Sequence, residues 1–136
     1  MKPRIALVIG AACALLFGAM LITTPDAILR GLGLEAHGDG ILVARHMAIV
    51  VLGLAVLNWL ARNAEGHTLR AILVANLFVQ VGGFVLRTAE IVTHQLPGAA
   101  WPSVVAQAVL STIFVFALLS TIARNRRRGD NVLSDG

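Results

Sequence analysis

The sequence predicts an all-α membrane protein, a bundle of four transmembrane helices with both termini on the cytoplasmic side. Of its 136 residues, 57% are hydrophobic and 13% are charged, whereas soluble domains have roughly 25% charged residues. The mean hydropathy of the chain is +0.82. Such a chain lacks the polar surface that a protein needs in water, so a soluble helical bundle with an apolar core is a poor alternative.

Four apolar runs make up most of the chain, and each is close to the ~20 residues that a helix needs to cross ~30 Å of hydrocarbon. None of them contains proline. A backbone in lipid must satisfy its own polar groups, so each run is predicted to be a helix. The runs are residues 5–22, 41–61, 69–86 and 104–123, with 18, 21, 18 and 20 residues.

The first run follows a short basic start, which is also the pattern of a signal peptide. The run is long for a signal peptide, and no clean small-x-small cleavage site follows Ile22, so we expect a retained span. Gly10, Ala14 and Gly18 recur every four residues within it, a pattern that lets two helices approach closely. We interpret this stripe as ordinary packing, and an interface with a structural partner is the alternative.

A short helix is predicted directly after the first span. Thr24 is its expected N-cap, Pro25 occupies the first helical position and Asp26 lies in the first turn. Gly31 and Gly33 then end the helix. We expect this helix to lie on the membrane surface.

The connections between the later runs are short. Residues 63–68 link the second and third runs, so these two helices are predicted to be antiparallel neighbours. Pro97-Gly98 marks a turn before the fourth run. Trp59 and Trp101 lie near span ends and fit the aromatic belts at the membrane boundary.

The positive charges predict the orientation of the four spans. Of the eleven Lys and Arg residues, eight fall on the side of the termini and three on the other side. The positive-inside rule therefore places both termini in the cytoplasm, with the protein in the cell inner membrane. The basic residues that give the net charge of +4 cluster at helix ends. They therefore indicate membrane orientation rather than nucleic-acid binding. We expect one transmembrane domain over residues 1–125 and a basic, then disordered, tail over residues 126–136.

Polar residues of the third segment, 69–94, share one helical face about 80° wide at 100° per residue. They are Asn76, Gln80, Gly83, Arg87, Glu90 and His94. A second polar face on the fourth span consists of Ser103, Gln107 and Ser111. We expect interhelical polar packing from Asn76, Gln80 and Ser111.

The other polar residues are expected to form a site in the outer leaflet. Arg45 and Arg87 each lie seven residues above the centre of their spans, about 10 Å at roughly 1.5 Å per residue. Glu90 is the only carboxylate nearby within the helices, which leaves one guanidinium for Asp26, a lipid phosphate or an anionic ligand. The candidate ligand-binding residues are Arg45, Arg87, Glu90, His46, His94, Gln107 and Ser103.

Two interpretations without a ligand are alternatives to a ligand site. In the first, Glu90 pairs with one of the arginines and the polar residues only fix helix packing. In the second, an arginine at this depth snorkels to the lipid headgroups. A pump or channel is disfavoured, because the cytoplasmic half of the bundle offers no continuous polar path.

No pattern in the sequence indicates catalysis, a metal or a cofactor. His46 and His94 are poorly placed to hold a haem between them, because His94 lies at the very end of its span. No Ser-His-Asp constellation, paired catalytic carboxylates or His-x-x-x-His motif appears. The single Cys13 excludes an internal disulfide and a cysteine metal cluster. We therefore lean towards a non-enzymatic or accessory protein, with catalysis left open.

Several short motifs resemble those of a known group of membrane proteins. They are Thr24-Pro25 after the first span, Leu29-x-x-Leu32-Gly33-Leu34, Arg45 early in the second span, and Leu52-Gly53-Leu54. Together with the order of the spans, these motifs resemble small, mostly uncharacterised bacterial four-helix membrane proteins of the DoxX-like kind, over roughly residues 1 to 125. Members of the wider group have been linked to sulfur- or quinone-related redox complexes, and the resemblance assigns no catalytic residue.

Three functions follow as expectations. The first is a small accessory membrane protein whose outer-leaflet polar pocket binds a lipid or a small amphiphile, including a quinone-like ring. The second is a membrane subunit of a quinone-linked oxidoreductase. The third is a structural partner in a membrane assembly, joined to another membrane protein or to copies of itself.

Overall fold

The computed structural model describes residues 2–134, within which the chain is helical and contains no strand. Four long helices and one short helix form the molecule, with two single-turn 3-10 helices between them. In order they are α1 (Pro3–Thr23), α2 (Pro25–Gly31), α3 (Gly38–Leu60), η1 (Ala61–Asn63), α4 (Gly66–Val92), η2 (Gly98–Ala100) and α5 (Trp101–Ser134).

Four segments are long and apolar enough to cross a membrane. They are Pro3–Thr23, Gly38–Asn63, Gly66–Val92 and Trp101–Arg124. The predicted four-helix membrane bundle is thereby confirmed, and the chain is a multi-pass membrane protein. Helix α5 continues to Ser134, through most of the predicted disordered tail. No proline interrupts it after Pro102, and arginine is a good helix former; residues 135–136 lie outside the described part.

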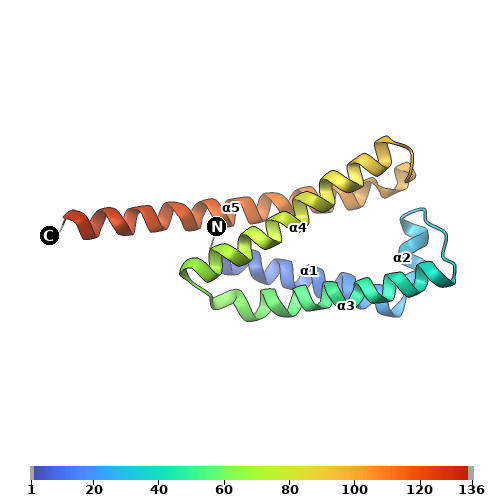
Figure 1. Cartoon of the computed structure of the whole chain (residues 1–136), viewed down its shortest axis with the longest axis horizontal. Coiled ribbons are helices and arrows are strands. Elements are labelled where there is room, and N and C mark those ends of the chain that lie inside the picture. Colours follow the sequence, from blue (N-terminus) through green and yellow to red (C-terminus); the bar gives the residue numbers. More distant parts are fainter. Residues whose placement is uncertain (1, 135–136) are drawn as a thin grey trace.

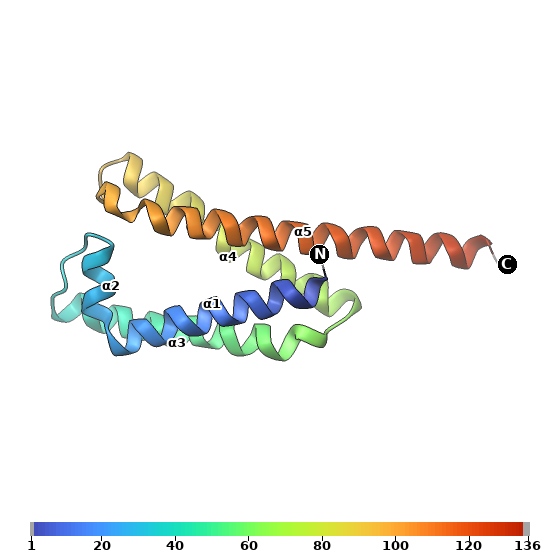
Figure 2. The same ribbon diagram turned by 180° about the vertical axis from the view of Figure 1, so that it is seen from behind.

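The long helices form two pairs, α1 with α3 and α4 with α5, as Figures 1 and 2 show. The N-terminus and the α3–α4 connection lie at one end, which we call the terminal end. Helix α2 and the α4–α5 connection lie at the other, which we call the distal end. The pairs meet at the terminal end and diverge towards the distal end.

The hydrophobic cores explain this divergence. At the terminal end one shared core joins α1, α4 and α5 to η1, the turn that follows α3, and it consists of Ala6, Leu7, Ala61, Leu69, Leu73, Phe114 and Ala117. At the distal end each pair has its own core. Leu21, Ala44 and Ala48 pack between α1 and α3. Ile91, Leu96, Ala100 and Val104 pack between α4 and α5. The predicted neighbours α3 and α4 are thus in contact mainly near the connection that joins them.

The small residues of α1 serve packing within the chain. A Cβ on Gly10 would lie 2.8 Å from Cζ of Phe114, and one on Gly18 would lie 2.8 Å from Cγ of Leu52. Both glycines are buried. The close approach that the stripe predicts therefore joins α1 to α3 and α5, as the packing interpretation expects.

A pair of asparagine amides lies where the four long helices meet. Asn58 of α3 and Asn76 of α4 have no exposed surface. Nδ2 of Asn58 donates to Oδ1 of Asn76 at 2.8 Å, and Nδ2 of Asn76 donates back to Oδ1 of Asn58 at 2.7 Å. Asn76 also donates to the carbonyl oxygen of Ile72 at 2.9 Å. This reciprocal pair joins the two helix pairs, and because both side chains are fully buried, solvent does not compete for its hydrogen bonds.

Helix α2 is the short helix predicted after the first span. Thr24 occupies the N-cap position, but its hydroxyl donates to the carbonyl oxygen of Met20 at 3.2 Å rather than capping α2. Gly33 follows with φ of +75°, a conformation that glycine adopts without strain. A Cβ there would overlap the ring of Pro97, so the α2–α3 connection contacts the α4–α5 connection at the distal end.

Candidate functional site

The polar stripe of α4 faces the interior of the bundle over most of its length. Asn76 is buried, and Gln80, Gly83, Arg87 and Glu90 are partly buried. Gln80 makes no interhelical hydrogen bond to any described residue. The helical period thus predicts the inward-facing residues of α4 correctly from Asn76 to Glu90.

His94 leaves this stripe because α4 ends before it. The helix stops at Val92, and His94 is exposed with φ of +59°. The backbone N–H groups of Gln95 and Leu96 both bond to the carbonyl oxygen of Glu90, at 2.8 and 3.0 Å. This left-handed residue turns the chain in the manner of a helix C-terminal cap, so His94 belongs to the turn rather than to the helical face.

Glu90 takes Arg87 as its partner. Nε of Arg87 lies 3.8 Å from Oε2 of Glu90, and both side chains are between a quarter and a third exposed. The two residues are three apart on the same helix, so the pair stays within α4. The sequence leaves open whether Arg45 or Arg87 pairs with Glu90. In the structure, the partner of Glu90 is Arg87.

Arg45 and His46 lie on the other helix pair. Both are exposed on the surface of α3, and His46 has Nδ1 2.9 Å from the carbonyl oxygen of Leu42. The buried face of α3 carries Ala44 and Ala48 against α1. Arg45 is turned about 100° from Ala44, which directs it away from that face.

The expected convergence of three spans therefore needs correction. The distal halves of α3 and α4 diverge (Figures 1 and 2), so Arg45 and His46 do not join Arg87 and Glu90. Packing of the small residues of α3 against α1 decides this outcome. Within the described part of the chain, no carboxylate forms an ion pair with Arg45.

Asp26, another expected partner for the surplus guanidinium, is already occupied. Its carboxylate accepts a hydrogen bond from Nη2 of Arg30, one turn later on α2. This hydrogen bond from Arg30 holds the pKa of the Asp26 carboxyl below its usual value. Asp26 is therefore not available as a partner for Arg45.

The polar face of α5 packs against α4 but is incompletely hydrogen-bonded. The side chain of Gln107 lies against Gly83, where an added Cβ would come within 2.5 Å of Nε2. Oε1 of Gln107 and Oγ of Ser111 are buried without a hydrogen-bond partner among the described residues. Ser103 donates to the carbonyl oxygen of Ala100 at 2.7 Å. Gln107 and Ser103 are thus near α4 and its connection, and neither contacts Arg45.

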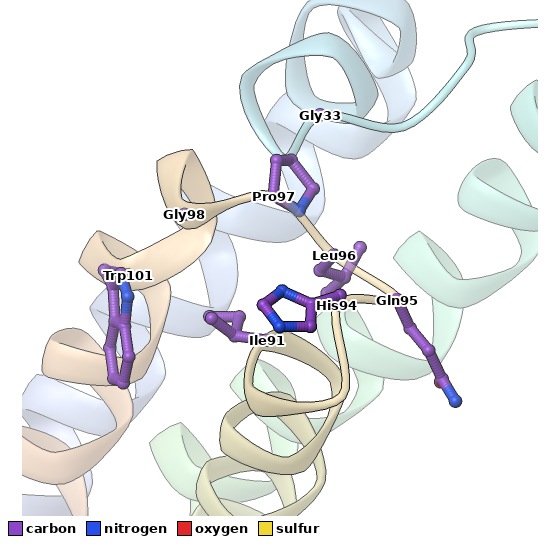
Figure 3. A pocket seen from close by; sticks show the side chains of 8 residues that line it. All are labelled: Gly33, Ile91, His94, Gln95, Leu96, Pro97, Gly98 and Trp101. Carbon is purple, nitrogen blue, oxygen red and sulfur yellow. The ribbon is translucent and has the colours of Figure 1, made fainter.

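An open cavity of about 600 Å³ lies at the distal end, beneath the contact between Gly33 and Pro97 (Figure 3). Its lining combines apolar and polar groups of α4, α5 and their connection. The lining residues are Gly33, Ile91, His94, Gln95, Leu96, Pro97, Gly98 and Trp101. The imidazole of His94 points into the space between α4 and α5, whereas the side chain of Gln95 points away from the other residues. We call this cavity the distal pocket.

The sequence predicts only one residue of the distal pocket, His94, as part of a site. It predicts a belt residue at Trp101 and a turn at Pro97-Gly98. The signal in the sequence is that His94, Pro97 and Trp101 fall within eight consecutive residues. Only the structure shows that Gly33, from a remote connection, closes over them.

The described residues include no group of three or more His, Cys, Asp or Glu side chains that could hold a metal ion. His46 and His94 belong to different helix pairs, so they do not face each other. Cys13 is exposed. The distal pocket brings aromatic, apolar and imidazole groups together, and the guanidinium groups of Arg45 and Arg87 lie outside its lining.

The fold places this chain in the class of multi-pass α-helical membrane proteins. Family models, curated proteins and solved structures contain no match to this chain. The resemblance to DoxX-like proteins therefore stays a prediction, and the functional argument depends on the geometry of this molecule.

Proposed function

We propose that this protein is a non-enzymatic, accessory component of the cell inner membrane that binds a lipid or another small amphiphile in its distal pocket. The distribution of positive charge supports an orientation with both termini in the cytoplasm. In that orientation the distal pocket lies in the outer leaflet.

The observation that carries the proposal is the mixed lining of the distal pocket. Ile91, Leu96 and Trp101 offer apolar and aromatic surface, and His94 adds a polar ring. Trp101 is the first residue of the fourth span, so the pocket lies at the membrane boundary. A ligand with a polar head and an apolar body matches both the lining and the depth.

Charged groups next to the pocket favour an anionic head. Arg87 lies one turn before Ile91 on α4, and its distance of 3.8 Å from Glu90 is long for an ion pair. A guanidinium in this position can bind a second oxyanion through its remaining N–H groups. Arg45, unpaired on α3, adds a separate contact for lipid phosphate at the distal end.

Trp101→Ala is expected to lower retention of the bound amphiphile about tenfold, which corresponds to ~1.4 kcal/mol. The physical reason is the loss of the largest aromatic surface in the pocket. The measurement is native mass spectrometry of protein purified with its native lipids, which also identifies the ligand. Phe78→Ala is the matched control, because Phe78 is an exposed aromatic residue of α4 that lines neither cavity. Equal retention in the Trp101 variant and the unmodified protein would contradict the proposal.

Arg45→Gln is expected to weaken the preference of the distal surface for anionic lipid about fivefold. An arginine near a headgroup layer contributes about 1 kcal/mol of attraction. The measurement is the fraction of anionic lipid that stays bound in mixed-lipid nanodiscs. Arg30→Gln serves as a control, since Arg30 already pairs with Asp26. A smaller effect of Arg45→Gln than of Arg30→Gln would mean that the unpaired guanidinium binds no lipid phosphate.

A membrane subunit of a quinone-linked oxidoreductase is the second candidate. The observation in its favour is that His94 and Trp101 bring two planar rings to the same pocket, on which a quinone ring can stack. Co-purification of a quinone and of a soluble redox partner would favour it over a simple lipid-binding role. For the structural-partner alternative, Gly10 and Gly18 are already packed within the chain, so a partner would have to bind through other residues of the bundle.

A further inference from the structure

A second cavity, of about 710 Å³, opens at the terminal end, at the opposite end of the bundle from the distal pocket. Its lining comes from the start of α1, the α3–α4 connection, the start of α4 and the end of the fourth span. The polar residues among the lining are Arg4, Arg62, Asn63, Glu65, Thr121 and Arg124. We call it the terminal cavity.

Positive charge dominates the terminal cavity. Three guanidinium groups line it, from Arg4, Arg62 and Arg124, against the single carboxylate of Glu65. None of these three arginines forms an ion pair with a described residue. The lining of the cavity therefore has an excess of two positive charges that no ion pair among the described side chains neutralises.

One of the three guanidiniums is held in position. Nη1 of Arg62 donates to the carbonyl oxygen of Trp59 at 2.6 Å, and its guanidinium carbon lies 4.3 Å from the centre of the Trp59 ring. The contact with the ring fixes the guanidinium plane without neutralising its charge. The remaining N–H groups of Arg62 can then bind an oxyanion with little loss of side-chain entropy.

The depth of the terminal cavity matches that of lipid phosphates. Arg4 is the second residue of the first span, Arg62 is the last but one of the second and Arg124 is the last of the fourth. Thr121, one turn inside the membrane from Arg124, is buried and already donates to the carbonyl oxygen of Ala117 at 2.8 Å. With Leu69 it gives the cavity an inner wall that suits the glycerol and first methylenes of a lipid.

We propose that the terminal cavity binds the headgroup of an anionic phospholipid that carries two phosphodiester groups. Guanidinium forks match phosphate oxygens in pairs, and basic pockets between transmembrane helices on this side of a membrane are suited to such headgroups. The excess of two positive charges fits two phosphodiesters better than one. This site lies at the other end of the bundle and is independent of the ligand proposed for the distal pocket.

The test uses the full chain in nanodiscs of zwitterionic lipid that contain a small fraction of cardiolipin or, at equal total charge, of phosphatidylglycerol. Native mass spectrometry measures which lipid stays bound. We expect cardiolipin to be retained, and Arg62→Gln or Arg124→Gln to reduce its retention about fivefold. Lys2→Gln is the control, because it removes a charge from the same end outside the cavity. Equal retention of the two lipids, or an equal effect of Lys2→Gln, would overturn the proposal.

A second measurement needs no change in the cavity itself. In a Trp101→Phe variant, Trp59 is the only tryptophan, and it touches Arg62. Brominated cardiolipin is expected to quench its fluorescence more strongly than brominated phosphatidylglycerol at equal charge. Inorganic phosphate at millimolar concentration should not relieve this quenching. Relief by phosphate would identify a soluble anion as the occupant, and equal quenching by both lipids would exclude a specific site.

Discussion

Gly10→Leu is expected to destabilise the bundle more than any other single substitution in α1. A Cβ on Gly10 would lie 2.8 Å from Cζ of Phe114 and 3.1 Å from Nδ2 of Asn58. Phe114 and Asn58 have no exposed surface, so neither can move aside. Overpacking of this kind typically costs 1–3 kcal/mol and occasionally more. The midpoint of unfolding in mixed micelles with a denaturing detergent, followed by circular dichroism, should fall accordingly.

Gly53→Leu is the matched control for this substitution. Gly53 lies in α3, and a Cβ there would meet nothing within 4 Å. Leucine is also a better helix former than glycine, by up to about 1 kcal/mol. The unfolding midpoint of this variant should therefore stay unchanged or rise. If both variants unfolded at the same midpoint, close packing at Gly10 would have no energetic importance.

The same experiment separates packing within the chain from association between chains. The stripe that contains Gly10 and Gly18 is compatible with both in the sequence. Packing within the chain predicts a lower unfolding midpoint that does not depend on protein concentration. Loss of an oligomer with an unchanged midpoint would instead support the structural-partner interpretation.

The spans could be predicted because the membrane restricts the choice. About twenty apolar residues without proline can cross lipid only as a helix. The start of α2 follows equally from the local preference for proline at a first helical position, which Pro25 occupies. These features depend on local sequence alone, and for that reason they were accessible before the structure.

The pairing of the helices could not be predicted in the same way. In lipid, both the inward and the outward faces of a helix are apolar, so hydropathy does not show which face is buried. In α3, the small side chains of Ala44 and Ala48 let α1 approach, so their face of the helix is the buried one. Arg45 is then directed away from that face. The helical period gives the angle between residues, but it does not give the direction of the neighbouring helix.

Two further residues show where the helical period fails. The helical period places His94 on the stripe of α4, on the assumption that the helix continues. The chain instead turns at His94, with a positive φ. The sequence assigns Asn58 to no site, although it is the only polar residue between His46 and Arg62. Its partner Asn76 lies 18 residues later in the chain, and only the approach of α3 to α4 shows that the two amides meet.

Replacement of Asn58 or Asn76 singly by leucine is expected to destabilise the protein by about 2 kcal/mol. Each substitution removes the two hydrogen bonds of the pair, of 2.8 and 2.7 Å, and the substitution at Asn76 also removes its bond to Ile72. It also leaves the other amide buried and partly unsatisfied, at a cost of about 1–3 kcal/mol. Unfolding in mixed micelles measures both effects, and Asn63→Leu, at an exposed position in the connection, should have little effect.

The double variant Asn58→Leu/Asn76→Leu distinguishes the pair from its two members. Once both amides are absent, no polar group is left without a partner, so the loss of stability should be clearly smaller than the sum of the two single effects. Interhelical hydrogen bonds in membranes give coupling energies of about 0.6 kcal/mol on average and up to about 1.7 kcal/mol. A coupling near the upper value is expected here, because both amides are fully buried and each acts as donor and acceptor to the other. Strict additivity of the single effects would show that the two side chains act separately and that the apolar core alone joins the helix pairs.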